Sequence, residues 1–353
     1  MSLDVTKAWV SRMYPHEKML TTCRFSPCGK FVAAGSTDTG VIRWELESAK
    51  KTVLEGHGSW ISALEFAGER LLTADVRGTV HAWPYLEEAP KPAWSIQEAH
   101  PVWLRALAAS PCGKRFATGG HDRVARVWDA GSGKLVREFS GHEGYVFSVA
   151  FHPDGKSLVT GDLFGTIRHW DLESGKLVRE LDAKVLHTRG EDFLADVGGV
   201  RSMTFDAEGK RLAASGLREA KSNTFCPGRP TVVVFDWASG ETRQHGVKEE
   251  KTDGPANRTR FLSDGSLAGA GEGQSLGGLW FWKGEAADPI HSVNAPSLYD
   301  LDLHPDGERL AAAGFEAKGR GGNGRHTARG EYVANAGAVR VYSLTPQPGP
   351  KKK

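Results

Sequence analysis

Short runs of residues whose apolar side chains recur with a period of two occur along the chain. In residues 146–151, Val146, Ser148 and Ala150 would point to one face of an extended strand, and the intervening Phe, Val and Phe to the other. Glycine-containing turns separate these runs. Both faces of each strand carry apolar side chains, so the pattern predicts β-sheets that are covered on both sides.

One unit of sequence is repeated along the chain. Residues 57–83, 100–129 and 142–171 each contain a His, an apolar strand, a Gly turn, a second strand, a short loop and a third strand that ends in Trp. Successive turn glycines are 39, 45, 42, 54, 56 and 42 residues apart, and they are Gly29, Gly68, Gly113, Gly155, Gly209, Gly265 and Gly307. The repeat therefore occurs seven times, with two longer copies.

An aromatic residue closes the third strand of every copy, and in copies three to five an Asp follows it. The aromatic residues are Trp44, Trp83, Trp128, Trp170, Phe235, Trp282 and Tyr342. This pattern resembles the WD40 repeat, whose period is about 40–45 residues. The resemblance implies an all-β fold, a seven-bladed WD40-type β-propeller with four-stranded antiparallel blades around a central channel.

We expect a single propeller over residues 1–345 and a Pro- and Lys-rich tail over 346–353. The last copy ends with its third strand, at residues 338–344, and residues 6–13 align with the fourth strand of another copy at 134–139. An N-terminal strand within residues 4–14 is therefore predicted to close the last blade and to pair two open edges. The expected blades are 17–55, 56–99, 100–141, 142–184, 185–247, 248–294 and 295–345.

The resemblance also implies a buried hydrogen-bond network of His, Asp, Ser or Thr, and Trp in each regular blade, with a structural role. Copy three matches it with His100, Asp122, Thr118 and Trp128. Copy four has His142, Thr160 and Trp170, but Phe164 stands at the Asp position, and in copy two that position is Arg77. Asp162 and Asp75, two residues earlier, are candidates to replace the missing Asp. Because these histidines occur once per blade, we expect no metal site.

Composition narrows the class of protein. The 43 Gly, 11 Trp and 15 Phe fit an all-β chain, and a net charge of +2 makes a dedicated nucleic-acid binder unlikely on charge grounds. The four cysteines form no C-x-x-C pair, so neither a disulfide framework nor a zinc site is expected. The first residues contain no apolar signal-peptide core, and no run of 18 apolar residues occurs. We expect a cytoplasmic protein without a cofactor.

Two short segments match catalytic motifs, but the secondary structure that each motif requires is not predicted around them. Residues 273–277 match G-x-S-x-G, but a nucleophile elbow needs a strand-to-helix turn. Residues 319–324 match G-x-G-x-x-G, but no βαβ unit surrounds them. We interpret both as glycine-rich loops.

Two features indicate where a partner would bind. Insertions in copies five to seven fall at one end of the ring, the top, and those in copies five and seven are rich in Lys and Arg, including Arg320 and Arg325. Aromatic and Arg residues also gather at the top of the inner strands. The binding candidates are Trp60, Trp103, Arg105, Tyr145, Phe147, Phe164, Arg201, Tyr299, Arg320 and Arg325. The alternative is that the inner-strand residues only pack against neighbouring blades.

The sequence thus predicts a noncatalytic scaffold that binds a protein or peptide through its top face, as a monomeric propeller within a larger complex. One alternative is an enzyme at the channel mouth, which a cluster of carboxylates or histidines there would support. Arg, Asn and aromatic residues occur there instead. The other is a binder of nucleic acid or another polyanion through the basic loops of blades five and seven.

Overall fold

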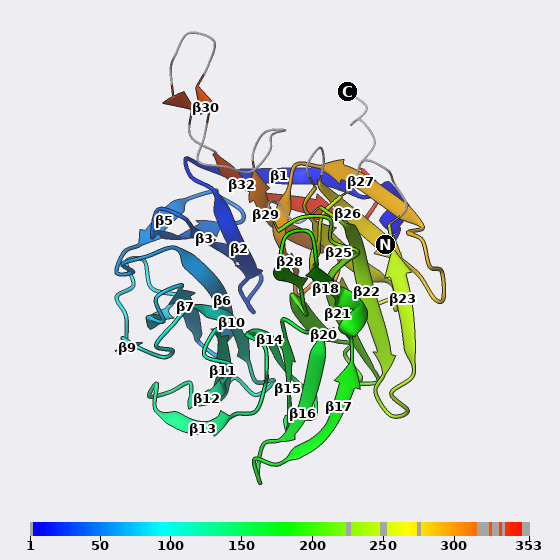
Figure 1. The fold of residues 1–353 in the computed structure, drawn as a ribbon. Coiled ribbons are helices and arrows are strands. Elements are labelled where there is room, and N and C mark those ends of the chain that lie inside the picture. The colour runs from blue at the N-terminus through cyan, green and yellow to red at the C-terminus, as the bar shows by residue number, and fades with distance from the viewer. Residues whose placement is uncertain are drawn as a thin grey trace.

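A computed structural model describes residues 3–223, 227–247, 253–273, 277–315, 325–326, 332–333 and 336–347. It contains seven four-stranded antiparallel sheets arranged as the blades of a ring (Figure 1). This confirms the predicted seven-bladed β-propeller. The inner strand of each blade faces the central channel, and the following strands run outward.

The first four blades are regular, and each takes its strands in chain order from the inside outward. Their strands are β2 (Leu20–Phe25), β3 (Phe31–Ser36), β4 (Val41–Glu45) and β5 (Lys51–Leu54) in blade 1; β6 (Ile61–Ala67), β7 (Arg70–Asp75), β8 (Val80–Pro84) and β9 (Trp94–Ile96) in blade 2; β10 (Leu104–Ala109), β11 (Arg115–Gly120), β12 (Ala125–Asp129) and β13 (Leu135–Phe139) in blade 3; and β14 (Val146–Phe151), β15 (Ser157–Asp162), β16 (Thr166–Asp171) and β17 (Leu177–Asp182) in blade 4.

The last three blades follow the same order, except at the outer edge of blade 7. Their strands are β20 (Ser202–Phe205), β21 (Arg211–Arg218), β22 (Arg229–Asp236) and β23 (Thr242–Gly246) in blade 5; β24 (Ala256–Phe261), β25 (Leu267–Gly271), β26 (Gly277–Trp282) and β27 (His291–Ala295) in blade 6; and β28 (Leu298–Leu303), β29 (Arg309–Phe315), β32 (Gly337–Ser343) and β1 (Trp9–His16) in blade 7.

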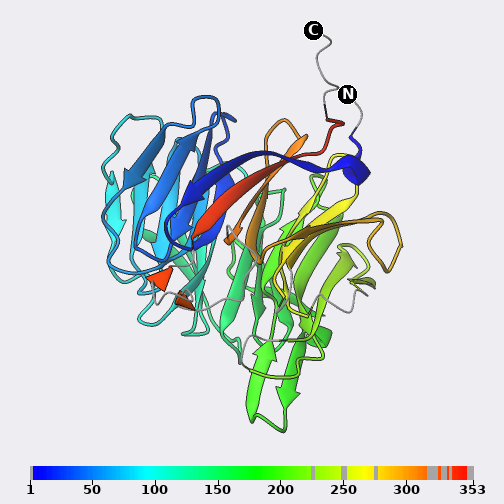
Figure 2. The same cartoon turned by 90° about the horizontal axis from the view of Figure 1, so that it is seen from above.

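The N-terminal strand closes the ring. β1 is the outer strand of blade 7 and pairs antiparallel with β32, for example Met13 with Arg340 (blue beside red in Figure 2). The predicted closure is therefore confirmed. The strand begins later than the alignment suggested, because a 3₁₀ turn, η1 (Val5–Lys7), occupies the first residues of the expected segment.

The core consists of apolar layers between neighbouring blades. Among the described residues, seven clusters of buried side chains each join two adjacent blades, and one of them packs Ala33 and Leu54 of blade 1 against Leu64 and Trp83 of blade 2. Glycine lets the blades approach closely: a Cβ on Gly35 would lie 2.4 Å from Ile61 of the next blade. A flat blade with two apolar faces can be stable only inside such a ring, because each neighbour removes one face from water.

The connection from blade 4 to blade 5 forms structure of its own. A 3₁₀ turn, η2 (Lys184–Leu186), leads into a two-stranded hairpin of β18 (His187–Gly190) and β19 (Ala195–Gly198). Val197 of this hairpin packs against Leu217 and Ala220 of blade 5 in a small separate cluster. A second short hairpin, β30 (Arg325–His326) with β31 (Tyr332–Val333), lies in the insertion of blade 7.

Candidate functional site

The predicted hydrogen-bond network is present in blade 3. His100 Nδ1 lies 2.8 Å from Asp122 Oδ1 and His100 Nε2 lies 2.8 Å from Thr118 Oγ1, while Trp128 Nε1 donates to the same threonine oxygen at 2.9 Å. Burial disfavours the charged carboxylate of Asp122, but hydrogen bonds from His100 and Arg126 outweigh it and lower the pKa of Asp122 to about 2. The network joins β11 and β12 to the segment before β10, and both ring nitrogens of His100 have hydrogen-bond partners.

In blades 2 and 4 the aspartate that stands two residues before the expected position completes the network. His142 Nδ1 lies 2.8 Å from Asp162 Oδ2, and the equivalent His57–Asp75 distance is 3.1 Å. Phe164 is not a member of this network. Its ring instead meets His187 of the β18–β19 hairpin edge-on, with the ring centroids 5.3 Å apart.

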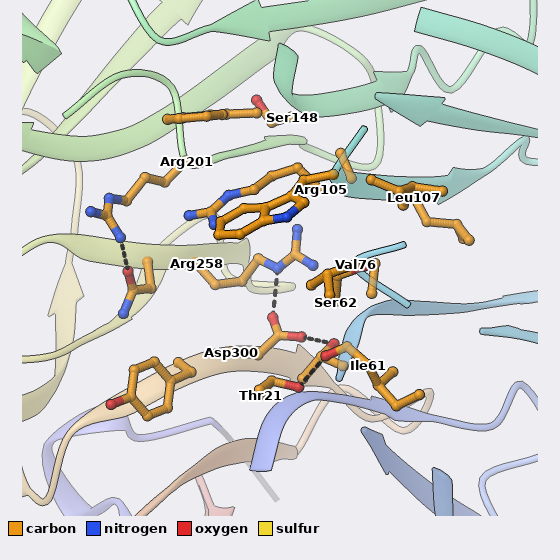
Figure 3. Close-up of a pocket in the computed structure, with 18 of the residues that line it drawn as sticks. Thr21, Ile61, Ser62, Val76, Arg105, Leu107, Ser148, Arg201, Arg258 and Asp300 are labelled. Atoms are coloured by element: carbon orange, nitrogen blue, oxygen red, sulfur yellow. Dashed lines mark hydrogen bonds and ion pairs between the residues drawn. The ribbon is translucent and has the colours of Figure 1, made fainter. Parts of the chain in front are cut away.

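A cavity of about 440 Å³ opens at the top of the channel, the end at which the inner strands begin (Figure 3). One equivalent position from every blade lines it. These residues are Thr21, Ser62, Arg105, Phe147, Arg201, Asn257 and Tyr299. Four of them, Arg105, Phe147, Arg201 and Tyr299, are among the binding candidates that the sequence predicts.

In six of the seven blades a β-bulge turns this side chain into the cavity, the exception being Arg201, which precedes β20. In β10, for example, Leu104 pairs with Gly120 and Ala106 with Gly119, so that Arg105 between them has no partner in the ladder. The same register shift occurs at the start of the inner strand in blades 1, 2, 4, 6 and 7. A bulge leaves its extra residue outside the ladder and re-aims its side chain. The ring therefore presents one variable side chain per blade at the same height.

Blades 2 to 4 supply the aromatic side of the site. Trp60 and Trp103 are 55% and 59% exposed and stand at the cavity wall. Trp103 lies 5.3 Å from the ring of His121, which stacks in parallel on Tyr145 at 4.3 Å. Tyr145 is 37% exposed and does not line the cavity. His121 was not predicted, although its position beside Asp122 in the repeat is a signal that could have identified it.

Blades 5 to 7 supply the polar side. Arg201 Nη1 donates to Asn257 Oδ1 at 3.2 Å and lies 3.8 Å from Glu272 Oε1. Tyr299 faces the same part of the cavity, and its pKa is raised, mainly by burial and in addition by the charge of Glu272. Glu272 comes from the connection between β25 and β26, so the loops of these blades also contribute to the site.

Buried ion pairs form the floor of the cavity. Asp300 accepts from Arg258 Nε at 2.6 Å and from Arg24 Nη1 at 2.6 Å. Burial disfavours the charged carboxylate, but the two guanidinium groups outweigh it and hold the pKa of Asp300 well below its usual range. None of these three residues is predicted from the sequence, since no local motif marks an ion pair between strands so far apart in the chain.

Several predictions lie outside this cavity or outside the described residues. Arg320, the G-x-G-x-x-G match at 319–324 and the central residues 274–276 of the G-x-S-x-G match belong to segments that the structure does not describe, and so does the tail from residue 348 on. Arg325 lies in β30, of which only the backbone is described. Within the described residues, no group of three or more His, Cys, Asp or Glu is arranged to hold a metal ion, and no helix is long and apolar enough to cross a membrane.

The fold and the site define the chain as a seven-bladed β-propeller with a lined cavity at the top of its channel. The family is indicated by residues 9–45, 92–129 and 133–171, which match the family described as WD domain, G-beta repeat. Three regions of this seven-bladed propeller are thus similar to WD40 repeats.

Three relatives illustrate the similarity. The chain is 27% identical over 148 residues to the periodic tryptophan protein 2 homolog of Caenorhabditis elegans, covering 41% of this chain and 16% of that protein. It is 29% identical over 120 residues to nuclear distribution protein nudF of Aspergillus niger, covering 33% and 26%. It is 29% identical over 143 residues to guanine nucleotide-binding protein subunit beta-1 of Nicotiana tabacum, covering 36% and 38%. The matched region is therefore well under two thirds of each relative.

Proposed function

We propose that this protein is a noncatalytic scaffold that binds a protein or peptide partner through the cavity and rim of its top face. The observation that carries the proposal is the exposure of two tryptophans, Trp60 and Trp103, on neighbouring blades beside a cavity that every blade lines. Large exposed aromatic side chains next to a concave, mixed polar surface are typical of binding sites.

The energetics favour a partner that covers these rings. A buried aromatic side chain removes about 150–250 Å² from water, and Trp, Tyr and Arg account for most of the binding energy at protein interfaces. Trp60, Trp103 and Arg105 combine these residue types within one sector of the rim. One of the relatives is itself named as a subunit, which fits a role in an assembly.

The ionisable groups of the cavity favour binding over catalysis. Asp300 is held as a carboxylate between two guanidinium groups, and Glu272 lies near Arg201. A general base needs a pKa near the working pH and access to a substrate proton. Asp300 has a lowered pKa and its oxygens already accept hydrogen bonds, so it is poorly suited to that role.

Site-specific photocrosslinking tests the proposal. A photoreactive amino acid at Val102, which is exposed next to Trp103, would be used to capture the partner in cells, and the crosslinked peptide would be identified by mass spectrometry. We expect one dominant partner, lost when Trp60 and Trp103 are both replaced by Ala. The matched control replaces Leu177 and Val178, two exposed apolar residues on the outer strand β17, by Ser. Unchanged crosslinking in the Trp variant, or equal loss in the control, would overturn the proposal.

A further inference from the structure

A second cavity, of about 360 Å³, lies at the other end of the channel, where the inner strands end. Phe151 and Phe205, the last residues of β14 and β20, line this lower cavity together with Pro111 and Pro153 from the turns that follow the inner strands. Arg258 lines both this cavity and the upper one. No described residue of the lower lining is one of the binding candidates predicted for the top face.

One position per blade, three residues after the ring that lines the upper cavity, gives the lower cavity two different walls. From blade 1 to blade 7 these residues are Arg24, Glu65, Ala108, Ala150, Thr204, Arg260 and Asp302. All of them except Asp302 line the cavity. Blades 6, 7, 1 and 2 thus carry charged side chains of alternating sign, whereas blades 3 to 5 carry small ones that leave the space open. A charged wall therefore faces a wall of small and apolar side chains.

The two acidic residues that line the lower cavity already accept hydrogen bonds on both carboxylate oxygens. Glu65 Oε2 accepts from Arg24 Nε at 3.0 Å, and Glu65 Oε1 accepts from the next backbone N–H at 3.1 Å. Asp206 Oδ2 accepts from Arg211 Nε at 2.9 Å, and Asp206 Oδ1 accepts from two backbone N–H groups. A cationic ligand would have to displace one of these donors.

The Arg258 guanidinium, in contrast, has hydrogen-bond donors to spare. Its Nε donates to Asp300 at 2.6 Å (dashed in Figure 3), and no described residue is hydrogen-bonded to its Nη1 or Nη2. A guanidinium group carries N–H donors on all three nitrogens. Burial, and after it the charge of Arg24, lowers the pKa of Arg258. The positive charges around Arg258 thus favour an anion beside its Nη atoms.

We propose that the lower cavity binds a small amphiphilic carboxylate, with its carboxylate on the Nη atoms of Arg258 and its apolar body against the wall of blades 3 to 5. A carboxylate supplies the acceptors that these donors lack, and its geometry matches the planar guanidinium. Small-molecule sites have volumes of roughly 300–1,000 Å³, so a cavity of about 360 Å³ suits a small acid. The site is independent of the proposed top-face partner, because it lies at the opposite end of the channel.

Methyl NMR of the full-length chain tests the proposal, because its methionines lie in different places. Met203 lines the lower cavity, Met19 directly precedes the inner strand of blade 1 at the top, and Met13 lies on the outer strand β1. Isotope-labelled methionine methyl signals would be assigned by replacing each Met in turn by Leu. The chain would then be titrated with hydrocinnamate, with its neutral isostere hydrocinnamamide and with phenylpropylammonium.

We expect hydrocinnamate to shift the Met203 signal and to leave the Met13 and Met19 signals in place. The carboxylate should bind about tenfold more tightly than the neutral amide, which corresponds to ~1.4 kcal/mol, because the amide keeps the apolar body but loses the charge. The ammonium compound should bind most weakly.

Variants that fill the space provide the sharper arm. Ala108→Leu should weaken hydrocinnamate binding about tenfold or more, because Ala108 is partly exposed and lines the lower cavity but not the upper one. Thr204→Leu fills the same cavity from blade 5 and serves as a second variant. Ala238→Leu is the matched control, since Ala238 is exposed in the turn between β22 and β23, and it should bind as the wild type does. Circular dichroism melts show whether each variant is folded.

The outcomes separate this inference from the proposed function. No shift of any signal with hydrocinnamate, equal binding of the carboxylate and the amide, or tighter binding of the ammonium compound overturns it. A shift of Met19 without a shift of Met203, or unchanged binding in folded Ala108→Leu or Thr204→Leu, overturns it as well. Photocrosslinking at the top face that depends on Trp60 and Trp103 would in each case leave the proposed function standing.

Discussion

Arg24 Nη1 and Asp300 Oδ2 lie 2.6 Å apart, although the two residues belong to the first and the last blade of the ring. Both side chains are buried, at 2% and 3% exposure. The same carboxylate also accepts from Arg258 of blade 6, so that one residue joins three successive blades at the channel. The ring is therefore closed twice, by the β1–β32 ladder at the outer edge and by this ion pair at the inner edge.

Replacing Asp300 by Asn should lower the free energy of unfolding by about 3–5 kcal/mol, because two buried guanidinium groups lose their shared counter-charge. Urea denaturation followed by tryptophan fluorescence measures the change. Asp192→Asn, at an exposed position of the β18–β19 hairpin, is the control and should leave the midpoint unchanged. Equal midpoints for wild type and Asp300→Asn would show that the inner closure contributes nothing.

The Asp122 carboxylate should make the free energy of unfolding depend on pH between about pH 4 and pH 2. Its pKa is about 2 in the folded protein and about 3.9 in an unfolded chain, so the folded state binds protons less readily. The stabilisation is fully present above about pH 4 and is lost as the pH falls toward 2. The difference in unfolding free energy between the wild type and Asp122→Asn should therefore shrink over this range. A constant difference between pH 5 and pH 2.5 would contradict the assignment.

Deleting residues 1–14 should sharply lower the melting temperature, because it removes most of β1 and leaves β32 as an open edge. Differential scanning calorimetry measures the shift. Deletion of residues 348–353 is the control and should leave the melting temperature unchanged. Equal melting temperatures for the two deletion variants would show that the β1–β32 pairing does not stabilise the ring.

Replacing Thr160 by Val should destabilise blade 4, because the His142 imidazole and the Trp170 indole N–H would both lose their hydrogen-bond partner. Thr160 Oγ1 lies 2.6 Å from His142 Nε2 and accepts from Trp170 Nε1 at 2.8 Å. Each buried polar group left without a partner costs about 1–3 kcal/mol. Thr160→Ser keeps the hydroxyl and should cost only about 1 kcal/mol, for one lost methyl group. Chemical denaturation of both variants provides the test, and equal losses would argue against the hydrogen bonds as the cause.

Repetition made much of this protein predictable. The seven turn glycines set the register of the blades, so residues such as Arg105 and Tyr299 could be assigned to equivalent positions although they are far apart in the chain. The structure places those positions together in one cavity. The closing strand was predictable for the same reason, since residues 6–13 resemble a fourth strand and the last copy has none.

Residues that interact between blades were not predictable in this way. Arg24 Nη1 lies 2.6 Å from Asp300 Oδ2, but no sequence motif links these two residues. Such pairs depend on the rotation between neighbouring blades, which no single repeat encodes. The contact between the Phe164 ring and His187 of the β18–β19 hairpin is another example, because the hairpin lies outside the repeated unit.

Sequence alone determined the number of blades, their strand order, the closing strand and several residues at the channel mouth, among them Arg105 and Tyr299, because a repeated pattern of turns and apolar residues constrains each blade locally. Only the tertiary structure decided that bulges at the starts of the inner strands turn those side chains inward, that Asp300 joins three blades, and that His121 supports the aromatic rim. These features depend on side chains from different blades, and only closure of the ring brings them within contact distance.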